Sequence, residues 1–114
     1  MRRDAFFDDT IMIDKTKIID TVRERLKKLP DGHYLDLRTY KRNRSVVIVK
    51  IDADNLLVIE DGYSSQRFQI KTEKLKKLLK TLLKKEFPRS HKIRLYVMER
   101  FVEDELGRIK RKIL

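Results

Sequence analysis

The 114-residue sequence has no cysteine and no tryptophan, and only three glycines and two prolines. Without cysteine the chain cannot form a disulfide scaffold, a cysteine zinc site or a thiol nucleophile, so its stability must come from packing. Long apolar runs are also missing. No stretch approaches the roughly 18 residues of a membrane span, and Asp4, Asp8 and Asp9 interrupt any signal-peptide core. We therefore expect a cytoplasmic protein that does not cross a membrane.

Acidic residues are scarce relative to basic ones, and the net charge is +11. The low content of Asn and Gln, with abundant Lys, Arg and Ile, is typical of heat-adapted proteins, but that composition predicts abundant Glu as well and does not explain the excess. Between residues 71 and 94 only Glu73 and Glu86 oppose ten basic side chains, which are Lys71, Lys74, Lys76, Lys77, Lys80, Lys84, Lys85, Arg89, Lys92 and Arg94. Such an imbalance predicts a polyanionic partner, most commonly a phosphate backbone.

The first part of the chain predicts an arm followed by a helix. Residues 1–12 show no sustained period, although two phenylalanines suggest that the arm docks somewhere, and we assign residues 13–114 to one α+β domain. Asp14 is a suitable N-cap for a helix whose apolar stripe continues to Leu29, and Pro30-Asp31-Gly32 ends that helix.

From His33 onward the apolar period changes to two. We expect strands over 33–40, 45–52, 56–60 and 63–70, joined by links of hairpin length into an antiparallel meander. Val46 to Val49 are apolar on both faces, which predicts a central strand.

The remaining residues predict a second helix and a fifth strand. A leucine stripe from Leu75 to Leu83 follows Thr72 as N-cap and stops at Phe87-Pro88, and residues 92–100 alternate as a strand. Residues 103–114 fit either a helix or a hairpin with a returning strand, and Gly107 favours the hairpin. The expected fold is a two-layer α+β domain of order α-β-β-β-β-α-β, with a sheet of four or five antiparallel strands and two helices on one face.

Tyrosine and arginine alternate on the predicted strands. If the apolar positions face the helices, Tyr34, Asp36, Arg38 and Tyr40 point outward from the first strand, as do Tyr63 and Arg67 from the fourth. Tyrosines between cations are typical of surfaces that stack unpaired bases, although Tyr with Arg is also an ordinary cross-strand pair.

Two further groups of cations are candidate phosphate contacts. One crowds the first hairpin, and the other forms the polar side of the second helix. The candidate nucleic-acid-binding residues are Arg38, Lys41, Arg42, Arg44, Lys74, Lys77, Lys80 and Lys84 for phosphates, with Tyr34, Tyr40, Tyr63 and Arg67 on the sheet.

Signs of catalysis are weak. His33 and His91 lie in turn-like contexts, and no glycine-rich phosphate loop or serine nucleophile motif is present. The nuclease arrangement of an acid followed by Glu-X-Lys on the next strand is not met, because Ile48 precedes Val49 and Lys50. Four acids between Asp52 and Asp61 would hold a hard cation only if they gathered at one sheet end, and we predict no metal and no cofactor.

The order of four strands and a helix over residues 33–86 resembles, in topology alone, the Pur and Whirly type of single-stranded nucleic-acid binders. The helix, three strands and helix are similar in the same sense to the double-stranded RNA-binding domain. The sequence favours a non-enzymatic module that binds RNA or single-stranded DNA. The alternatives are a protein-interaction or structural domain that meets an acidic protein, and a small metal-independent ribonuclease. The sequence makes no prediction of oligomeric state.

Overall fold

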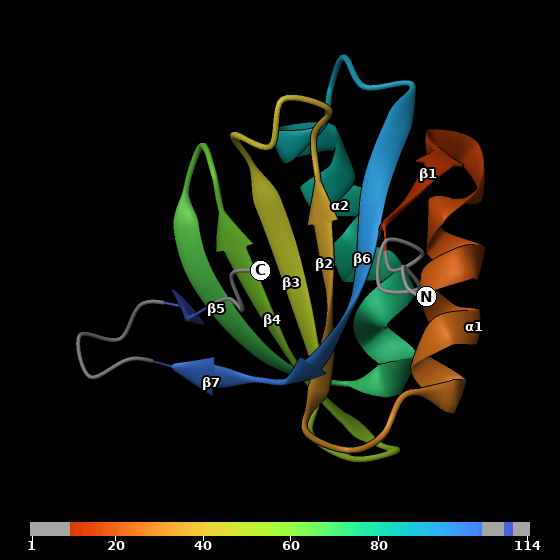
Figure 1. Ribbon diagram of the computed structural model, residues 1–114, viewed down its shortest axis with the longest axis vertical. Helices are drawn as coiled ribbons and strands as arrows, with labels where there is room; N and C mark the ends of the chain where they lie inside the picture. Colours follow the sequence, from red (N-terminus) through yellow and green to blue (C-terminus); the bar gives the residue numbers. More distant parts are fainter. Residues whose placement is uncertain (1–9, 104–108, 111–114) are drawn as a thin grey trace, which may run out of the picture.

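The computed structural model describes residues 10–103 and 109–110, which form a sheet covered on one face by two helices (Figure 1). The main sheet is antiparallel and has the strand order β1-β6-β2-β3-β4-β5. The strands are β1 (Thr10–Asp14), β2 (His33–Arg38), β3 (Ser45–Lys50), β4 (Asn55–Asp61), β5 (Ser65–Lys71) and β6 (Lys92–Arg100). Six strands replace the four or five expected, and the two-layer α+β architecture is confirmed.

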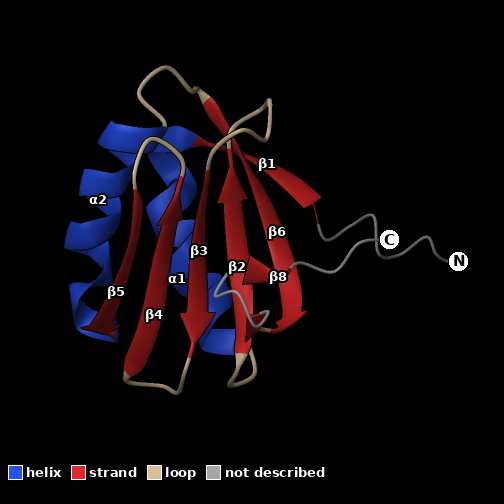
Figure 2. Ribbon diagram, turned by 90° about the vertical axis from the view of Figure 1, so that its left-hand side faces the viewer, coloured by secondary structure: helices blue, strands red, loops and turns tan. Residues whose placement is uncertain are grey.

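Both helices lie on the same side of the sheet, as predicted (Figure 2). Short 3-10 turns, η2 (Lys15–Lys17) and η3 (Thr72–Lys74), lead into α1 (Ile18–Lys28) and α2 (Leu75–Glu86). The leucine stripe of α2 and the apolar stripe of α1 close a continuous core against the inward side chains of β2, β3, β4 and β6. The apolar residues that recur every 3.6 positions in the helices and every second position in the strands therefore pack into one core.

The additional strand is β1, which pairs with β6 along the sheet edge, for example Ile11 with Leu95. Residues 10–12, expected in an arm, belong to this strand, whereas the expected docking of Phe6 and Phe7 lies outside the described residues. A five-residue edge strand was missed because half of it was counted with the arm and the rest with the helix start.

Two predicted helix caps are wrong in detail. The Asp14 side chain makes no capping hydrogen bond, and its carboxylate lies 3.4 Å from the Lys92 ammonium instead. The Thr72 hydroxyl donates a hydrogen bond to the Ala53 carbonyl at 2.9 Å, and the 3-10 turn that precedes α2 begins at Thr72 itself. The helix positions were correct, but the polar side chains bind neighbouring strands and loops.

The C-terminal hairpin is confirmed where the structure describes it. β7 (Val102–Glu103) pairs with β8 (Ile109–Lys110) in an antiparallel two-stranded sheet. The central position of β3 is confirmed as well, since Val46 to Val49 are all buried.

Candidate functional site

The solvent side of α2 and of the last residue of η3 is a lysine face, which we define as Lys74, Lys76, Lys77, Lys80 and Lys84. All five side chains are exposed, while the leucines on the opposite side of the helix are in the core. Among the side chains that the structure describes, no carboxylate forms an ion pair with any of them. Lys76, Lys80 and Lys84 follow one another at i and i+4, where like charges repel. The face therefore carries a concentrated positive charge that the described part of the protein leaves uncompensated.

The neighbouring helix is a useful comparison. On α1 the exposed side chains carry both signs, because Asp20 and Glu24 accompany the four bases Arg23, Arg25, Lys27 and Lys28. Mixed charge of this kind is what solubility alone requires. The lysine face is thus a property of α2 and not of the helical layer as a whole.

The four predicted cations of the β2–β3 hairpin do not form one cluster. Arg38 donates from Nε and Nη2 to Asp36 Oδ2 at 3.1 and 3.0 Å, and its guanidinium lies over the Tyr96 ring at 5.4 Å from the centroid. Arg42 is exposed and donates to the Tyr96 hydroxyl oxygen at 3.0 Å. Arg38 and Arg42 therefore share a tyrosine on the outer face of the sheet, the face without helices.

The other two hairpin cations take different directions. Arg44 reaches toward the helix layer, where Nη1 donates to the Glu86 carbonyl at 3.2 Å and Nε lies 3.9 Å from the Glu86 carboxylate. Lys41 is exposed at the hairpin tip. Arg44 therefore fixes the hairpin to the end of α2, and Lys41 remains available to a ligand.

The predicted tyrosine face is wrong for Tyr34. The ring does point away from the helices, but it is 2% exposed because it packs with Val47, Val49 and Ile59 and makes an edge contact with Phe101 at 5.5 Å. A small second core thus occupies this part of the outer face. The buried ring has no face open to a base.

The other three predicted sheet residues are Tyr40, Tyr63 and Arg67, and all three are exposed. Tyr40 is 68% exposed on the β2–β3 hairpin, and Tyr63 is 75% exposed on the β4–β5 turn. Arg67 is exposed on β5, where it pairs in register with Ile59. The Arg94 guanidinium lies 4.7 Å from the centroid of the Tyr40 ring.

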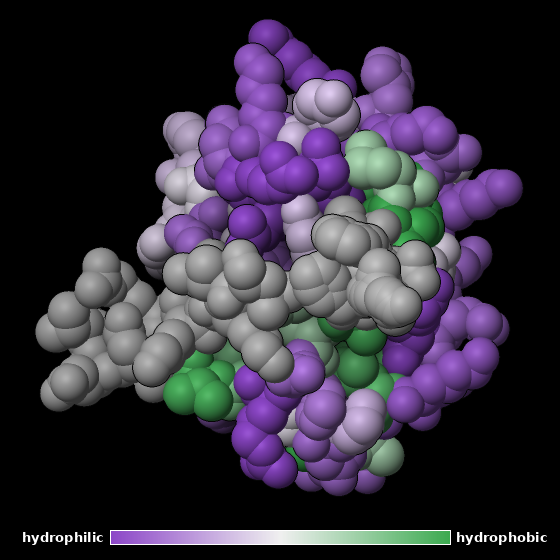
Figure 3. All heavy atoms as spheres, in the orientation of Figure 1, coloured by the Kyte–Doolittle hydropathy of each residue, from purple (hydrophilic) through white to green (hydrophobic). Residues whose placement is uncertain are grey.

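A cleft of about 920 Å³ lies between the β2–β3 hairpin and the loop that joins α2 to β6. These loops meet at the same end of the sheet (Figure 1), and hydrophilic residues gather over that end of the outer face (Figure 3). The walls of this cleft, which we call the cationic cleft, carry one buried carboxylate and several cations. The lining residues are Met12, Thr39, Tyr40, Lys41, Asn43, Arg44, Glu86, Pro88, Arg89, Ser90, His91 and Lys92. The sequence placed Arg89 and Lys92 in the charge excess but did not identify them as a site.

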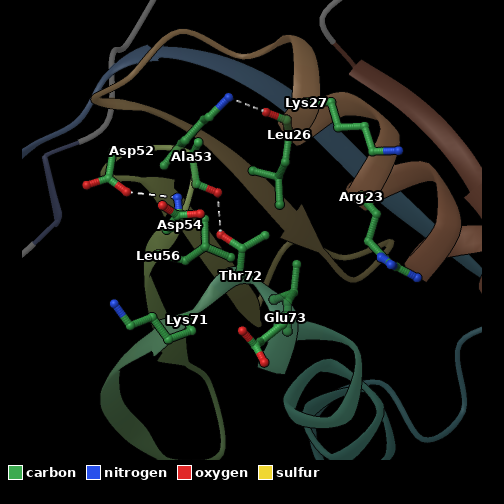
Figure 4. Close-up of a pocket in the computed structure, with 12 residues that line it drawn as sticks. Arg23, Leu26, Lys27, Asp52, Ala53, Asp54, Leu56, Lys71, Thr72 and Glu73 are labelled. Atoms are coloured by element: carbon green, nitrogen blue, oxygen red, sulfur yellow. Dashed lines mark hydrogen bonds between the residues drawn. The ribbon is translucent and has the colours of Figure 1, made fainter.

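A second hollow, of about 670 Å³, lies at the opposite end of the sheet and has balanced charge (Figure 4). Arg23, Lys27, Lys50 and Lys71 line it together with three acids, and many of its polar groups already have protein partners. Lys50 Nζ donates to the Leu26 carbonyl at 2.7 Å, and Lys71 Nζ donates to the Asn55 side-chain oxygen at 3.0 Å. These bonds hold α1 and the β3–β4 turn in place, so the hollow has a structural explanation.

The four acids between Asp52 and Asp61 do not gather at one place. Asp52 and Asp54 precede β4, whereas Glu60 and Asp61 end it. Asp52 accepts hydrogen bonds from the Asn55 side chain and from the Asp54 N–H, and these bonds lower the pKa of its carboxyl. Among the residues that the structure describes, no group of three or more His, Asp or Glu is arranged to hold a metal ion.

A buried acidic pair, Glu60 and Glu86, was not predicted. Both side chains are fully buried beside the β4–β5 turn, where Glu86 accepts hydrogen bonds from the N–H groups of Tyr63 (2.7 Å) and Ser64 (3.2 Å). Lys85 lies 3.2 Å from the Glu60 carboxylate. The inward register of Glu60, two residues after Val58, was the available signal.

The two carboxyls of this pair have opposite pKa shifts. Burial and the adjacent Glu86 raise the pKa of Glu60, against the effect of Lys85. Burial also opposes ionisation of Glu86, but the neighbouring Glu60 carboxyl and the hydrogen bonds from the two N–H groups outweigh it, so the Glu86 pKa is lowered. Glu86 is therefore the ionised partner, and Glu60 is the one that retains a proton more strongly.

Comparison with protein-family models, with curated proteins and with solved structures finds no match to this chain. No helix in the described ranges is long and apolar enough to span a membrane.

Proposed function

We propose that this protein is a non-enzymatic nucleic-acid-binding module that takes RNA or single-stranded DNA in preference to duplex DNA. The observation that supports it most is the lysine face, because five exposed ammonium groups on one side of a helix have no carboxylate partner among the described residues. A phosphate backbone supplies negative charge at regular spacing, and counterion release rewards each phosphate that a lysine neutralises.

The position of α2 adds to this argument. The helix is about 18 Å long at 1.5 Å per residue, and its last residue, Glu86, lines the cationic cleft. Lys41, Arg89 and Lys92 line the same cleft as this last residue, so the helix ends beside a second group of cations. The exposed ring of Tyr40 lines the same cleft. An aromatic ring stacks on the face of a base, and in a duplex those faces are already covered by neighbouring bases, so this position favours a single strand.

The proposal is tested by fluorescence anisotropy with labelled single-stranded RNA, single-stranded DNA and duplex DNA. The variant Lys77→Glu, Lys80→Glu, Lys84→Glu should weaken binding of all three probes strongly, because it replaces three phosphate contacts by repulsion. Because these side chains are exposed and unpaired within the described residues, the variant should keep its fold, and circular dichroism checks this.

The matched control is Lys17→Glu, Lys27→Glu, Lys28→Glu, which makes the same change of net charge with exposed lysines on η2 and α1. Equal loss of affinity in both variants would show that net charge alone drives binding, and unchanged affinity in the α2 variant would remove the lysine face from the account. Cleavage of the labelled RNA by the wild-type protein would contradict the non-enzymatic assignment.

A further inference from the structure

We propose that the cleft between the β2–β3 hairpin and the α2–β6 loop is a nucleotide site. It would hold one unpaired nucleotide, with the base stacked on Tyr40 and the phosphate held by Lys41, Arg89 and Lys92. This inference rests on the proposed nucleic-acid binding and specifies which part of the ligand enters the protein. The cleft volume of about 920 Å³ falls in the range of small-molecule sites.

Tyr40 is prepared for stacking by Arg94. The Arg94 guanidinium lies 4.7 Å from the ring centroid, and Arg94 Nε donates to the Tyr40 carbonyl at 2.9 Å. One arginine thus fixes both the backbone and the ring of Tyr40, yet the side chain remains 68% exposed. With a cation against one face of the ring, a base can stack on the other, and little side-chain freedom is lost on binding.

The hairpin that carries Tyr40 is held in a defined conformation. The Arg42 N–H donates to the Thr39 carbonyl at 2.9 Å, and the Thr39 N–H donates to the Arg44 carbonyl at 3.2 Å. The Thr39 hydroxyl also donates to the Asn43 side-chain oxygen at 2.7 Å. Arg42 itself has φ of +62°, a left-handed conformation that tightens the turn. The loop is therefore ordered before a ligand arrives.

The charge of the cleft suits a phosphate. Lys41 and Arg89 are exposed, and Lys92 has only a surface ion pair with Asp14, at 3.4 Å between partly exposed groups, which a phosphate can displace. Glu86 is the one acid among the lining residues, and it is buried and held by backbone N–H groups. An anion in the cleft therefore meets no exposed carboxylate among the lining residues, and it competes with Asp14 for Lys92.

The test compares Tyr40→Ala with two controls, Tyr40→Phe and Ile51→Ala. We expect Tyr40→Ala to weaken binding of a single-stranded oligonucleotide about tenfold, within the roughly 5- to 150-fold loss of one stacked base, while duplex binding changes less than about twofold. Tyr40→Phe keeps the ring and Ile51→Ala removes an exposed apolar side chain outside the cleft, so both should bind like the wild type.

A second experiment distinguishes three possible ligands of the cleft: a nucleotide within a strand, a free nucleotide, and phosphate alone. Isothermal calorimetry with AMP and with inorganic phosphate should give much weaker binding than the oligonucleotide, and Arg89→Ala should weaken oligonucleotide binding and flatten its salt dependence. AMP binding as tight as the oligonucleotide's would assign the cleft to a free nucleotide and overturn the strand proposal.

The outcomes distinguish this inference from the proposed function. Salt-dependent oligonucleotide binding that Tyr40→Ala and Arg89→Ala leave unchanged would overturn the nucleotide site and leave the lysine-face account standing. Absence of any oligonucleotide binding by the wild type would overturn both.

Discussion

Glu60 and Glu86 form a buried pair, and we predict that replacing each by Gln changes the free energy of unfolding in opposite directions. Replacing either residue by Gln preserves the side-chain volume and removes one titratable group from a site that is fully buried. Glu86→Gln should destabilise the protein, because an amide has one acceptor oxygen where the carboxylate has two. One of the two bonds to the Tyr63 and Ser64 N–H groups is then lost, and the other is no longer charge-assisted.

The magnitude follows from those bonds. A partly buried N–H left without its acceptor costs about 1–3 kcal/mol, and the weakened second bond adds about 1 kcal/mol, so we expect the free energy of unfolding to fall by about 3 kcal/mol. The ion pair with Arg44 adds little, because that guanidinium is one-third exposed and 3.9 Å away.

Glu60→Gln should instead stabilise the protein at neutral pH. Since the folded-state pKa of Glu60 is raised, the native protein binds its proton more tightly than the unfolded chain does. The free energy of unfolding therefore decreases as pH rises from the unfolded value, about 4.3, through the raised folded value, and the full penalty is present above that value. The substitution removes this penalty, and its advantage over the wild type should disappear below about pH 4.

Urea unfolding at a series of pH values measures both effects, with unchanged m-values as the check that the denatured states are comparable. Glu86 has a lowered pKa, so its contribution is present above the unfolded value and is lost as pH falls through the folded value. Destabilisation by both substitutions at pH 7, or stabilisation by both, would refute the assignment of Glu86 as the ionised partner.

Three further predictions concern packing and backbone conformation, and urea unfolding measures each of them. Gly62→Ala should lower the free energy of unfolding by more than about 1 kcal/mol, because the new Cβ would lie 2.5 Å from a Glu86 carboxylate oxygen. Its effect should also differ in the Glu86→Gln background, and simple additivity of the two changes would contradict this. Gly32→Ala should cost about 1–2 kcal/mol since Gly32 has φ of +85°, and a neutral effect would show that the turn relaxes. Tyr34→Ala should cost about 3–5 kcal/mol, whereas the exposed Tyr40→Ala should change stability by less than about 0.5 kcal/mol; similar losses would contradict the burial of Tyr34.

The helices and strands were predictable because their apolar periods are strong and uninterrupted. The strand predicted over residues 92–100 coincides with β6, and the leucine stripe identified α2 to within a turn. Edge strand β1 was less predictable. It has five residues and is followed at once by a helical turn, so its alternation is too short to be separated from the neighbouring segments.

The site was less predictable than the fold because periodicity assigns a side chain to a face and not to the interior or the solvent. Tyr34 was correctly placed on the outer face, yet Val47 and Ile59 on neighbouring strands build a second core there. The cations were similarly divided: Arg38 and Arg44 have carboxylate partners, as does Lys85 on α2, whereas the lysine face has none among the described residues. Which charges are compensated depends on register between strands, which one sequence specifies only indirectly.

The most direct test of the central claim is the dependence of oligonucleotide affinity on salt concentration. If the five residues of the lysine face each neutralise one phosphate of a single strand, a plot of log K against log salt has a slope of about −3.5, at about 0.7 per contact. The variant with Lys77, Lys80 and Lys84 changed to Glu should reduce the slope by at least about 2. A wild-type slope between zero and about −1, or a steep slope that the variant leaves unchanged, would contradict phosphate binding by α2.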